Sequence, residues 1–194
     1  MSAHERALHG GGLAIVPTDT VYGIGCAAGL RDACERLYEC KARPADQPTA
    51  LVLGSVDHLL EHALPDLAGR AGALCRRVLP GPVTLILPNP GRRFAHLCGA
   101  TPTRIGVRVP VLTADVAALA DAVGGLALTS ANLRGEPPPA RLAAVPAELR
   151  GVCAFAIDGG DLAGTASSVV DVTGLEPVLI RAGADAESVL ASLR

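Results

Sequence analysis

Short apolar runs and segments of helical periodicity alternate along the chain. The apolar runs predict β-strands at residues 13–17, 50–54, 83–87, 105–110 and 126–130, and three more near 153–158, 167–172 and 177–181. Apolar positions that recur every three or four residues predict α-helices at 2–9, 31–42, 66–79, 113–123 and 184–193, with shorter ones from about 55 and about 140. Strands interleaved with helices, and too apolar to face water, predict an open α/β sheet covered on both faces.

The length and composition favour one domain, spanning residues 1–194, with an aliphatic core. A chain of 194 residues is within the range of a single domain, and neither an internal repeat nor a linker interrupts it. Apolar residues make up 49% of the chain but aromatic residues only 2%, so Ala, Val, Leu and Ile must build the core. This composition excludes a disordered chain and argues against an aromatic platform for stacking bases.

The charge balance implies that any anion-binding site is a local group of basic residues and not the surface as a whole. With 17 basic and 19 acidic residues, the net charge of -2 argues against a protein that binds nucleic acid or anionic membranes through bulk charge. Lys41 is the only lysine, and all the other residues among the 17 lysines and arginines are arginines. No apolar run reaches the roughly 18 residues of a membrane span, and the start lacks the features of a signal peptide. We therefore expect a cytoplasmic protein with no membrane partner.

Three patterns that suggest chemistry have simpler explanations. His58, Glu61 and His62 have the spacing of some zinc peptidases, but their segment has the pattern of an amphipathic helix with a solvated face. The glycines of residues 159–165 lack the lysine of a phosphate loop, so this segment is interpreted as a connection between strands. The six cysteines form no CxxC pair and are expected to be reduced thiols. No metal ligand is assigned to a protein side chain.

Four polar segments follow or precede apolar strands, where open α/β sheets bind their ligands: PTDTVYG (17–23), KARP (41–44), TSANLRG (129–135) and TASSVVD (165–171). In the second, Pro44 favours an exit from helical geometry near Ala42, which would bring Lys41 and Arg43 together on a loop. Two cations held together suit a polyphosphate, although charges at a helix C-terminus also complement the helix dipole.

The other segments also leave two interpretations open. The hydroxyls and carboxylate of 17–22 could bind a ligand or stabilise a turn, and Asn132 could bind a phosphate or purine edge or form an Asx turn. Arg108 and Arg181 are single cations within apolar strands. Each needs a partner, which is either a protein carboxylate or a ligand.

Together, the segments PTDTVYGIG, KARP, PGPVTLIL, GVRVP, LTSANLRG and SSVVD, followed by Arg181, resemble the YrdC/TsaC family of threonylcarbamoyl-AMP synthases. The resemblance covers residues 10–184, in order. It implies a single YrdC-like domain in which a twisted, mostly open mixed sheet is flanked by helices around a deep basic cavity. It also implies that L-threonine, bicarbonate or CO2, and ATP are converted to threonylcarbamoyl-AMP and pyrophosphate. The product would serve the threonylcarbamoyl transferase machinery that modifies adenosine in tRNA.

The resemblance also implies roles for individual residues. Lys41 and Arg43 would be catalytic, with Mg2+ bridging the phosphates. The residues expected to bind ATP are Lys41, Arg43, Gln47, Ser130, Asn132 and Arg181. The residues expected to bind threonine are Thr20, Arg108 and Ser167, with Arg108 on the carboxylate. The chain departs from the family pattern at Gln47, Val52 and Leu128, where Asn, His and a polar residue are usual, so the amino-acid site is less firmly predicted than the ATP site.

Two other functions remain open on the sequence. The chain could be a paralogue that uses a different acceptor amine, because the departures at Val52 and Leu128 concern that side of the site. It could also be a non-catalytic protein that binds double-stranded RNA or tRNA in a basic cavity, although the net charge of -2 weakens this hypothesis. The chain ends soon after the last motif, so no additional C-terminal domain is expected.

Overall fold

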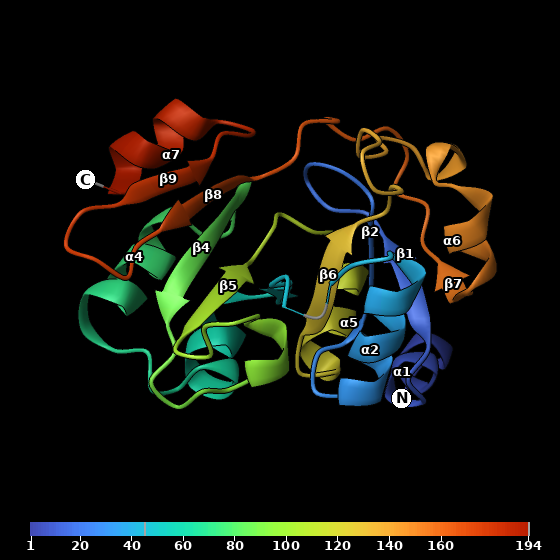
Figure 1. The fold of residues 1–194 in the computed structure, drawn as a ribbon, viewed down its shortest axis with the longest axis horizontal. Helices are drawn as coiled ribbons and strands as arrows, with labels where there is room; N and C mark the ends of the chain where they lie inside the picture. Colours follow the sequence, from blue (N-terminus) through green and yellow to red (C-terminus); the bar gives the residue numbers. More distant parts are fainter. Residues whose placement is uncertain (45, 194) are drawn as a thin grey trace.

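A nine-stranded sheet runs through the protein and carries helices on both faces (Figure 1). The computed structural model describes residues 1–44 and 46–193. The strands are β1 (Leu13–Val16), β2 (Gly23–Ala27), β3 (Ala50–Val52), β4 (Val83–Pro88), β5 (Arg104–Arg108), β6 (Leu126–Ser130), β7 (Cys153–Ala156), β8 (Ser168–Asp171) and β9 (Val178–Arg181). Their spatial order is β7-β1-β2-β6-β3-β5-β4-β8-β9. The pairs β1–β7, β3–β5 and β4–β8 are parallel and the others antiparallel, which confirms the predicted open mixed sheet.

The helices are short and connect these strands. They are α1 (Ala3–His9), α2 (Arg31–Cys40), α3 (Val56–His58), α4 (Gly69–Val78), α5 (Ala114–Ala122), α6 (Ala147–Gly151) and α7 (Ala186–Leu193), with a π-helical turn at Leu59–Ala63 and 3-10 turns at Ala95–Leu97 and Leu142–Ala144. Ser2 caps α1 in a reciprocal capping box with Glu5. Among the described residues, no helix has the length and apolar character needed to cross a membrane.

Alternate residues of the strands pack into two separate apolar clusters. The larger cluster lies on the face covered by α2, α4, α6 and α7, and its strand members include Ile15, Ile24, Leu51, Leu85 and Val107. The smaller cluster lies on the opposite face, where α1 and α5 pack against Val16, Val52, Leu126 and Leu128. Because successive side chains of a strand point to opposite faces, this division explains why the strands are apolar on both sides.

The face that carries α5 is covered over only part of its width. Val52 and Leu128, on β3 and β6, pack in the cluster with α5. On β4, Ile86 and Pro88 point to this same face and are half-buried, whereas Leu85 and Leu87 on the other face are fully buried. Thr84 and Arg108 also point to the α5 face, since their chain neighbours belong to the larger cluster. Polar side chains of β4 and β5 thus lie on the face that carries α5, where Thr84 and Arg108 are nevertheless buried.

Two local expectations were wrong. No strand was predicted at residues 23–27, but β2 lies there, between β1 and β6. Its glycines are required because a Cβ on Gly23 or Gly25 would stand 2.7 Å from the isobutyl group of Leu128. The helix predicted from about residue 140 is instead the 3-10 turn Leu142–Ala144 followed by α6, because Pro146 stops the first turn and begins the second.

Leu85 tests the contribution of the larger cluster to stability. Its side chain is fully buried in β4. We expect Leu85→Ala to lower the free energy of unfolding by about 2–5 kcal/mol, through lost burial and the cavity left behind, measured by urea unfolding. The control is Leu175→Ala, because Leu175 is 89% exposed and its truncation should change stability by less than about 0.5 kcal/mol. Equal losses in the two variants would contradict this packing.

Candidate functional site

The connection from β1 to β2 links the polar segments predicted from the sequence. β6 ends at Ser130, which pairs with Gly23 at the start of β2. β5 ends at Arg108, which pairs with Val52 at the end of β3, and Val52 pairs with Leu126 at the start of β6, so Arg108 and Ser130 lie toward opposite ends of β6. The segment 17–22 begins beside Ser130 and reaches Arg108 through Asp19 and Thr20, and Ser167 immediately precedes β8. The sheet topology thus brings together residues that are up to 161 positions apart, from Thr20 to Arg181.

Lys41 reaches back from the end of α2 to the end of β6. Its side chain is 6% exposed, and Nζ donates to the backbone carbonyl of Ser130 at 2.8 Å and to that of Asn132. Ala42 has a left-handed φ of 47°, so the backbone leaves the helix where the sequence predicted. This exit turns the next cation, Arg43, towards the same strand end.

Arg43 contacts a residue that the sequence hypothesis did not include. Its Nη1 donates to Thr129 Oγ1 at 2.7 Å, and its Nη2 donates to the carbonyl of Pro48 at 2.8 Å. Neither Arg43 nor Lys41 forms an ion pair within the part of the chain that the structure describes. The two cations are thus held by neutral acceptors, and their charges remain available to an anion.

The pKa values of both cations are depressed. Burial, followed by the charge of Arg43, lowers the pKa of Lys41 from 10.5 to about 8. Burial also lowers the pKa of the Arg43 guanidinium. Since a bound phosphate would favour both charged forms, the pair gains stability when an anion enters.

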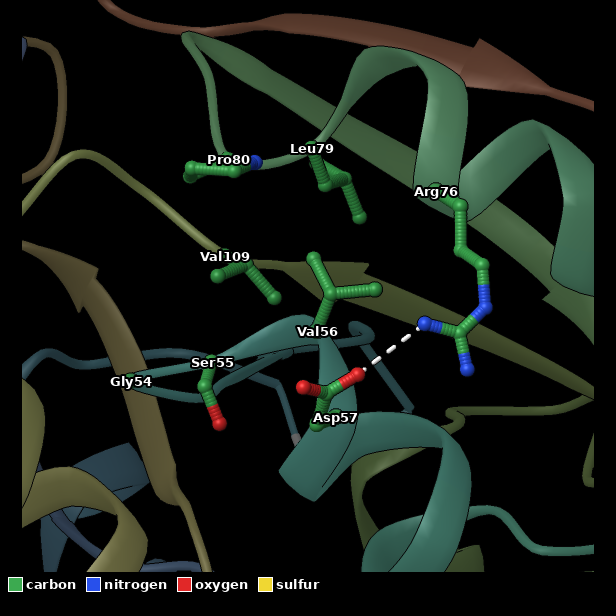
Figure 2. Close-up of a pocket in the computed structure, with 8 residues that line it drawn as sticks. All are labelled: Gly54, Ser55, Val56, Asp57, Arg76, Leu79, Pro80 and Val109. Atoms are coloured by element: carbon green, nitrogen blue, oxygen red, sulfur yellow. Dashed lines mark hydrogen bonds and ion pairs between the residues drawn. The ribbon is translucent and has the colours of Figure 1, made fainter.

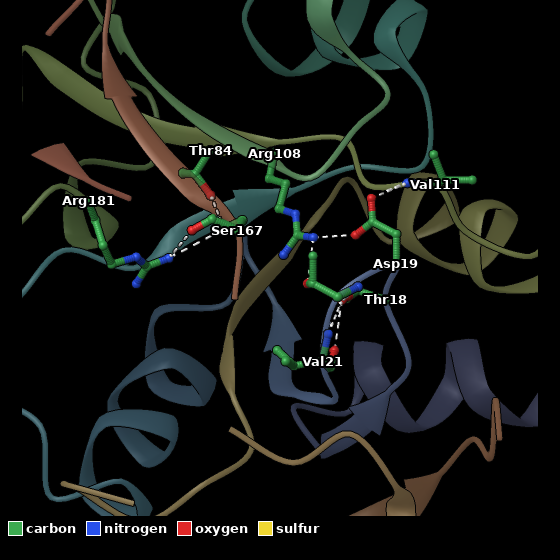
Figure 3. Close-up of polar contacts among 9 residues, drawn as sticks. Thr18, Asp19, Val21, Thr84, Arg108, Val111, Ser167 and Arg181 are labelled. Atoms are coloured by element: carbon green, nitrogen blue, oxygen red, sulfur yellow. Dashed lines mark hydrogen bonds and ion pairs between the residues drawn. The ribbon is translucent and has the colours of Figure 1, made fainter. Parts of the chain in front are cut away.

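Arg108 is buried in the sheet and held by the segment that connects β1 to β2 (Figure 3). It is 7% exposed, and its Nη2 donates to Thr20 Oγ1 at 2.8 Å and to Asp19 Oδ1. The second oxygen of Asp19 accepts from the backbone N–H of Val111 at 3.0 Å. Burial lowers the pKa of Arg108, and the Asp19 carboxylate opposes that shift. Asp19 thus compensates part of the cost of burying this charge.

The directions of the hydrogen bonds made by the Thr20 hydroxyl follow from its neighbours. Thr18 Oγ1 donates its proton to the carbonyl of Val21 at 2.7 Å, so in its 3.0 Å contact with Thr20 Oγ1 it must accept. Thr20 therefore donates to Thr18 and accepts from Arg108. These hydrogen bonds fix the orientation of the Thr20 hydroxyl and of the Arg108 guanidinium within the protein itself.

Arg181, Ser167 and Thr84 form a second group beside Arg108 (Figure 3). Arg181 Nη2 donates to the carbonyl of Ser167 at 2.8 Å and lies 3.4 Å from its hydroxyl. That hydroxyl is also 3.1 Å from Thr84 Oγ1. The charge of Arg181 contributes to the lowered pKa of Arg108, so the two guanidiniums are close enough to repel each other. Arg181, expected with ATP, therefore lies next to Ser167, expected with threonine.

Unpartnered polar atoms gather on the predicted residues. Four buried side-chain polar atoms lack a hydrogen-bond partner among the described residues, and three of these atoms are Arg43 Nε, Arg108 Nε and Asn132 Oδ1. Asn132 Nδ2 donates to the carbonyls of Leu133 and Glu136, so its amide also stabilises the loop that follows β6. Because buried polar atoms are normally paired, these three atoms indicate a site for a polar ligand.

Three other residues differ from the expectations in detail. The side chain of Gln47 is exposed, and its backbone carbonyl, not its amide group, accepts a hydrogen bond from Tyr38. Val52 and Leu128 pack in the apolar cluster under α5, on the same face as Arg108. Sequence reasoning also missed Asp19, although a carboxylate in the first polar segment and an unpaired arginine in an apolar strand were both visible.

The patterns set aside in the sequence lie elsewhere. The imidazole rings of His58 and His62 are 5.0 Å apart, and within residues 1–44 and 46–193 no group of three His, Cys, Asp or Glu is placed to hold a metal ion. In the glycine-rich segment, the N–H of Gly159 donates to the Tyr22 hydroxyl, which in turn donates to Asp158. These contacts tie the segment to the start of β2.

A cavity of about 390 Å³ lies between α3 and the end of α4 (Figure 2). It is lined by Ser55, Asp57, Arg76 and Val109 among others, and Arg76 forms a 2.9 Å ion pair with Asp57 at its rim. Residues predicted to bind ATP or threonine do not line this cavity. The deep basic cavity expected from the resemblance therefore stays a prediction.

Comparisons with known proteins show what the chain as a whole is similar to. The family model for Sua5, YciO and YrdC proteins, described as "Telomere recombination", matches residues 6–183. Threonylcarbamoyl-AMP synthase of Pyrococcus abyssi is 34% identical over 174 residues, covering 89% of this chain and 51% of that protein. The Bacillus subtilis protein of the same name is 34% identical over 172 residues, covering 86% of this chain and 48% of that protein. The chain thus spans about half the length of these relatives.

A solved structure extends the likeness to three dimensions. The crystal structure of P. abyssi Sua5 complexed with L-threonine has a TM-score of 0.83 and 32% sequence identity to this chain. The match covers 98% of this chain and 57% of that chain. The fold is therefore shared with that protein.

Lys41 gives a direct test of the electrostatics of the site. As the only lysine, it gives a single side-chain signal in protein labelled with [13Cε]-lysine. We expect this signal to titrate with a midpoint of about 8, because burial and Arg43 disfavour the ammonium form. Loss of the signal in Lys41→Arg would confirm its assignment. A midpoint near the ordinary value of 10.5 would show that the ammonium is solvated and the description of the site wrong.

Asp19 tests the compensation of Arg108. We expect Asp19→Ala to lower the free energy of unfolding by about 3 kcal/mol, because it leaves a buried guanidinium without its counter-charge. Asp57→Ala is the matched control, since it removes a carboxylate from an ion pair whose side chains are 56% and 73% exposed. Its cost should be below about 1 kcal/mol in the same denaturation assay. Equal costs would mean that Arg108 is paired by solvent.

Proposed function

The chain belongs to the Sua5/YciO/YrdC family, and on this premise we propose that it is an L-threonylcarbamoyladenylate synthase. Its substrates in this proposal are L-threonine, bicarbonate or CO2, and ATP. Its products are threonylcarbamoyl-AMP and pyrophosphate. The observation that carries the proposal is the set of unpartnered buried atoms on Arg43, Arg108 and Asn132, which offers donors and an acceptor to a polar ligand.

Lys41, Arg43, Ser130 and Asn132 form the proposed nucleotide side of the site. Lys41 and Arg43 supply two positive charges that no carboxylate of the described residues neutralises within an ion pair. The planar guanidinium of Arg43 suits two phosphate oxygens, and the Lys41 ammonium acts as a point charge. Asn132 Oδ1, which has no partner, is available to accept a hydrogen bond from the nucleotide. Gln47, in the same segment as the cations, is assigned to this side on the resemblance alone.

Arg108, Thr20 and Ser167 form the proposed amino-acid side. The free Nε of Arg108 is suited to the threonine carboxylate, because a charge-assisted hydrogen bond would supply the acceptor that it lacks. Thr20 and Ser167 offer hydroxyls on either side of this guanidinium. Arg181 lies against Ser167, at the boundary of the two sides, where its charge can face the phosphates.

The reaction needs charge neutralisation and alignment more than a strong protein base. The threonine amine takes up CO2 and loses a proton, giving a carbamate. A carbamate oxygen then attacks the α-phosphorus of ATP, a new P–O bond forms, and the bond to the β-phosphate oxygen breaks to release pyrophosphate. Negative charge accumulates on the phosphate oxygens, where Lys41 and Arg43 would stabilise it.

Mg2+ enters this proposal as part of the Mg–ATP substrate. The side chains nearest the proposed phosphate positions are cations and neutral hydroxyls, and the carboxylate of Asp19 is engaged by Arg108 and Val111. The phosphates themselves would therefore supply most of the metal's ligands. The product would pass to a transferase that modifies adenosine in tRNA.

Pyrophosphate release tests the proposal. With ATP and Mg2+ present, we expect release to require both L-threonine and bicarbonate, and to be faster with L-threonine than with L-serine. Release that is independent of bicarbonate would exclude the carbamate step and contradict the proposal, and release that needs bicarbonate but a different amine in place of L-threonine would point to a different acceptor. ATP binding without release, together with a salt-dependent affinity for RNA, would instead favour a non-catalytic RNA-binding protein.

Variants of Arg108 and Arg76 separate the site from the surface. We expect Arg108→Lys to raise the KM for threonine by about tenfold or more, because Lys cannot reproduce the planar guanidinium, while the KM for ATP changes little. Arg76→Lys is the control, since Arg76 lies in an exposed ion pair outside the proposed site.

A further inference from the structure

Two cysteines that play no part in the proposed synthesis lie against each other between α2 and β2. Cys26, on β2, and Cys34, on α2, have their sulfur atoms 3.7 Å apart, and both side chains are buried. Cys34 Sγ also lies 3.9 Å from the carbonyl oxygen of Ala28. A rotation of the two thiols is thus needed to bring the sulfurs to the length of about 2.05 Å of a disulfide. The helix and the strand already pack directly on each other.

A second cavity, of about 360 Å³, reaches Cys34 but not Cys26. Cys34, Tyr38 and His96 line it, while Arg31 and Glu35 form an exposed ion pair at its rim. His96 Nε2 lies 2.8 Å from the carbonyl oxygen of Ala28, and because a carbonyl only accepts, this nitrogen carries a proton. Cys34 is therefore the member of the pair that a small molecule would meet first, beside an imidazole.

The surroundings of Cys34 favour its thiolate. A hydrogen bond from the Cys26 thiol is the largest cause of the lowered pKa of Cys34, and contact with His96 lowers it further. The same contact raises the pKa of His96, which favours an imidazolium beside the sulfur. By contrast, burial raises the pKa of Cys40, Cys75, Cys98 and Cys153. The six cysteines are thus chemically unequal, and Cys34 is the one prepared to act as a nucleophile.

We propose that Cys34 and Cys26 form a peroxide-reactive dithiol site, in which the cavity beside His96 admits a hydroperoxide to Cys34 and Cys26 resolves the oxidised sulfur. The proposal does not depend on the function proposed above. Hydrogen peroxide suits the cavity because it is little larger than water and both polar and uncharged.

The chemistry balances in two steps. The Cys34 thiolate attacks one oxygen of hydrogen peroxide, the O–O bond breaks, and the hydroxide released takes a proton, for which His96 is the nearest donor. Cys34 is then a sulfenic acid, and peroxide has been reduced to water. Cys26 sulfur attacks the Cys34 sulfur, the S–O bond breaks, and the leaving hydroxyl takes the Cys26 proton to form a second water. Two thiols and one peroxide have become one disulfide and two waters.

The experiment maps the products of oxidation in the full chain. Protein treated with one equivalent of hydrogen peroxide is alkylated, digested without reductant and analysed by mass spectrometry. We expect a Cys26–Cys34 disulfide that dithiothreitol reverses, with the other four cysteines alkylated. Oxidation of Cys40 or Cys153 before Cys34, or no Cys26–Cys34 disulfide, would overturn the proposal.

Three variants assign the roles within the site. In Cys26→Ser, the resolving thiol is absent, so Cys34 should accumulate as a sulfenic acid that reacts with dimedone. At pH 5, below the pKa of about 6, His96→Gln should slow the oxidation of Cys34 by about tenfold, as expected if one pKa unit of thiolate stabilisation is lost. Cys75→Ser is the matched control, because Cys75 is equally buried in the same cluster. This variant should leave unchanged both the rate at which Cys34 is oxidised and the rate at which the Cys26–Cys34 disulfide forms. Oxidation of Cys34 that is insensitive to both His96→Gln and Cys26→Ser would contradict the assigned roles.

Discussion

Moving a guanidinium from water into the interior of a sheet costs several kcal/mol unless its donors find acceptors and its charge finds a counter-charge. Arg108 sits in such a place, between two residues of the larger apolar cluster. Asp19 supplies the counter-charge and Thr20 supplies an acceptor. Both belong to the connection between β1 and β2, at least 88 residues before Arg108 in the chain. The fold of that connection, and through Val111 that of the loop after β5, therefore depends on this one cation.

Lys41 and Arg43 are stabilised by a different means. They are held by carbonyl and hydroxyl oxygens, which orient the charges without neutralising them. A carboxylate partner would have satisfied the cations, but it would also have repelled a phosphate. The lowered pKa of Lys41 reflects this arrangement, because the protein does not fully compensate the positive charge that burial and Arg43 disfavour. The protein thus contains a compensated guanidinium on β5 and an uncompensated pair of cations held at the end of β6.

The parts of this arrangement that depend on local sequence could be predicted, and those that depend on tertiary contacts could not. The apolar runs located eight of the strands, and Pro44 located the exit from helical geometry at Ala42. β2 was not predicted because its glycines are required by close packing against Leu128, which is over 100 residues away in the sequence. The contact between Arg43 and Thr129 and the ion pair between Asp19 and Arg108 escaped for the same reason. Sequence alone named the charges in need of partners but not the partners.

Strand register connects the apolar core to the site. Because side chains alternate along a strand, a shift of β5 by one residue would turn Arg108 towards α4 and bring Val107 to the α5 face. Such a shift would bury the cation among Leu and Val side chains without Asp19, so the cost would be that of an unpaired buried charge. The larger apolar cluster and the ion pair with Asp19 therefore oppose the same displacement. Both interactions therefore fix the position of the guanidinium, one through packing and the other through charge.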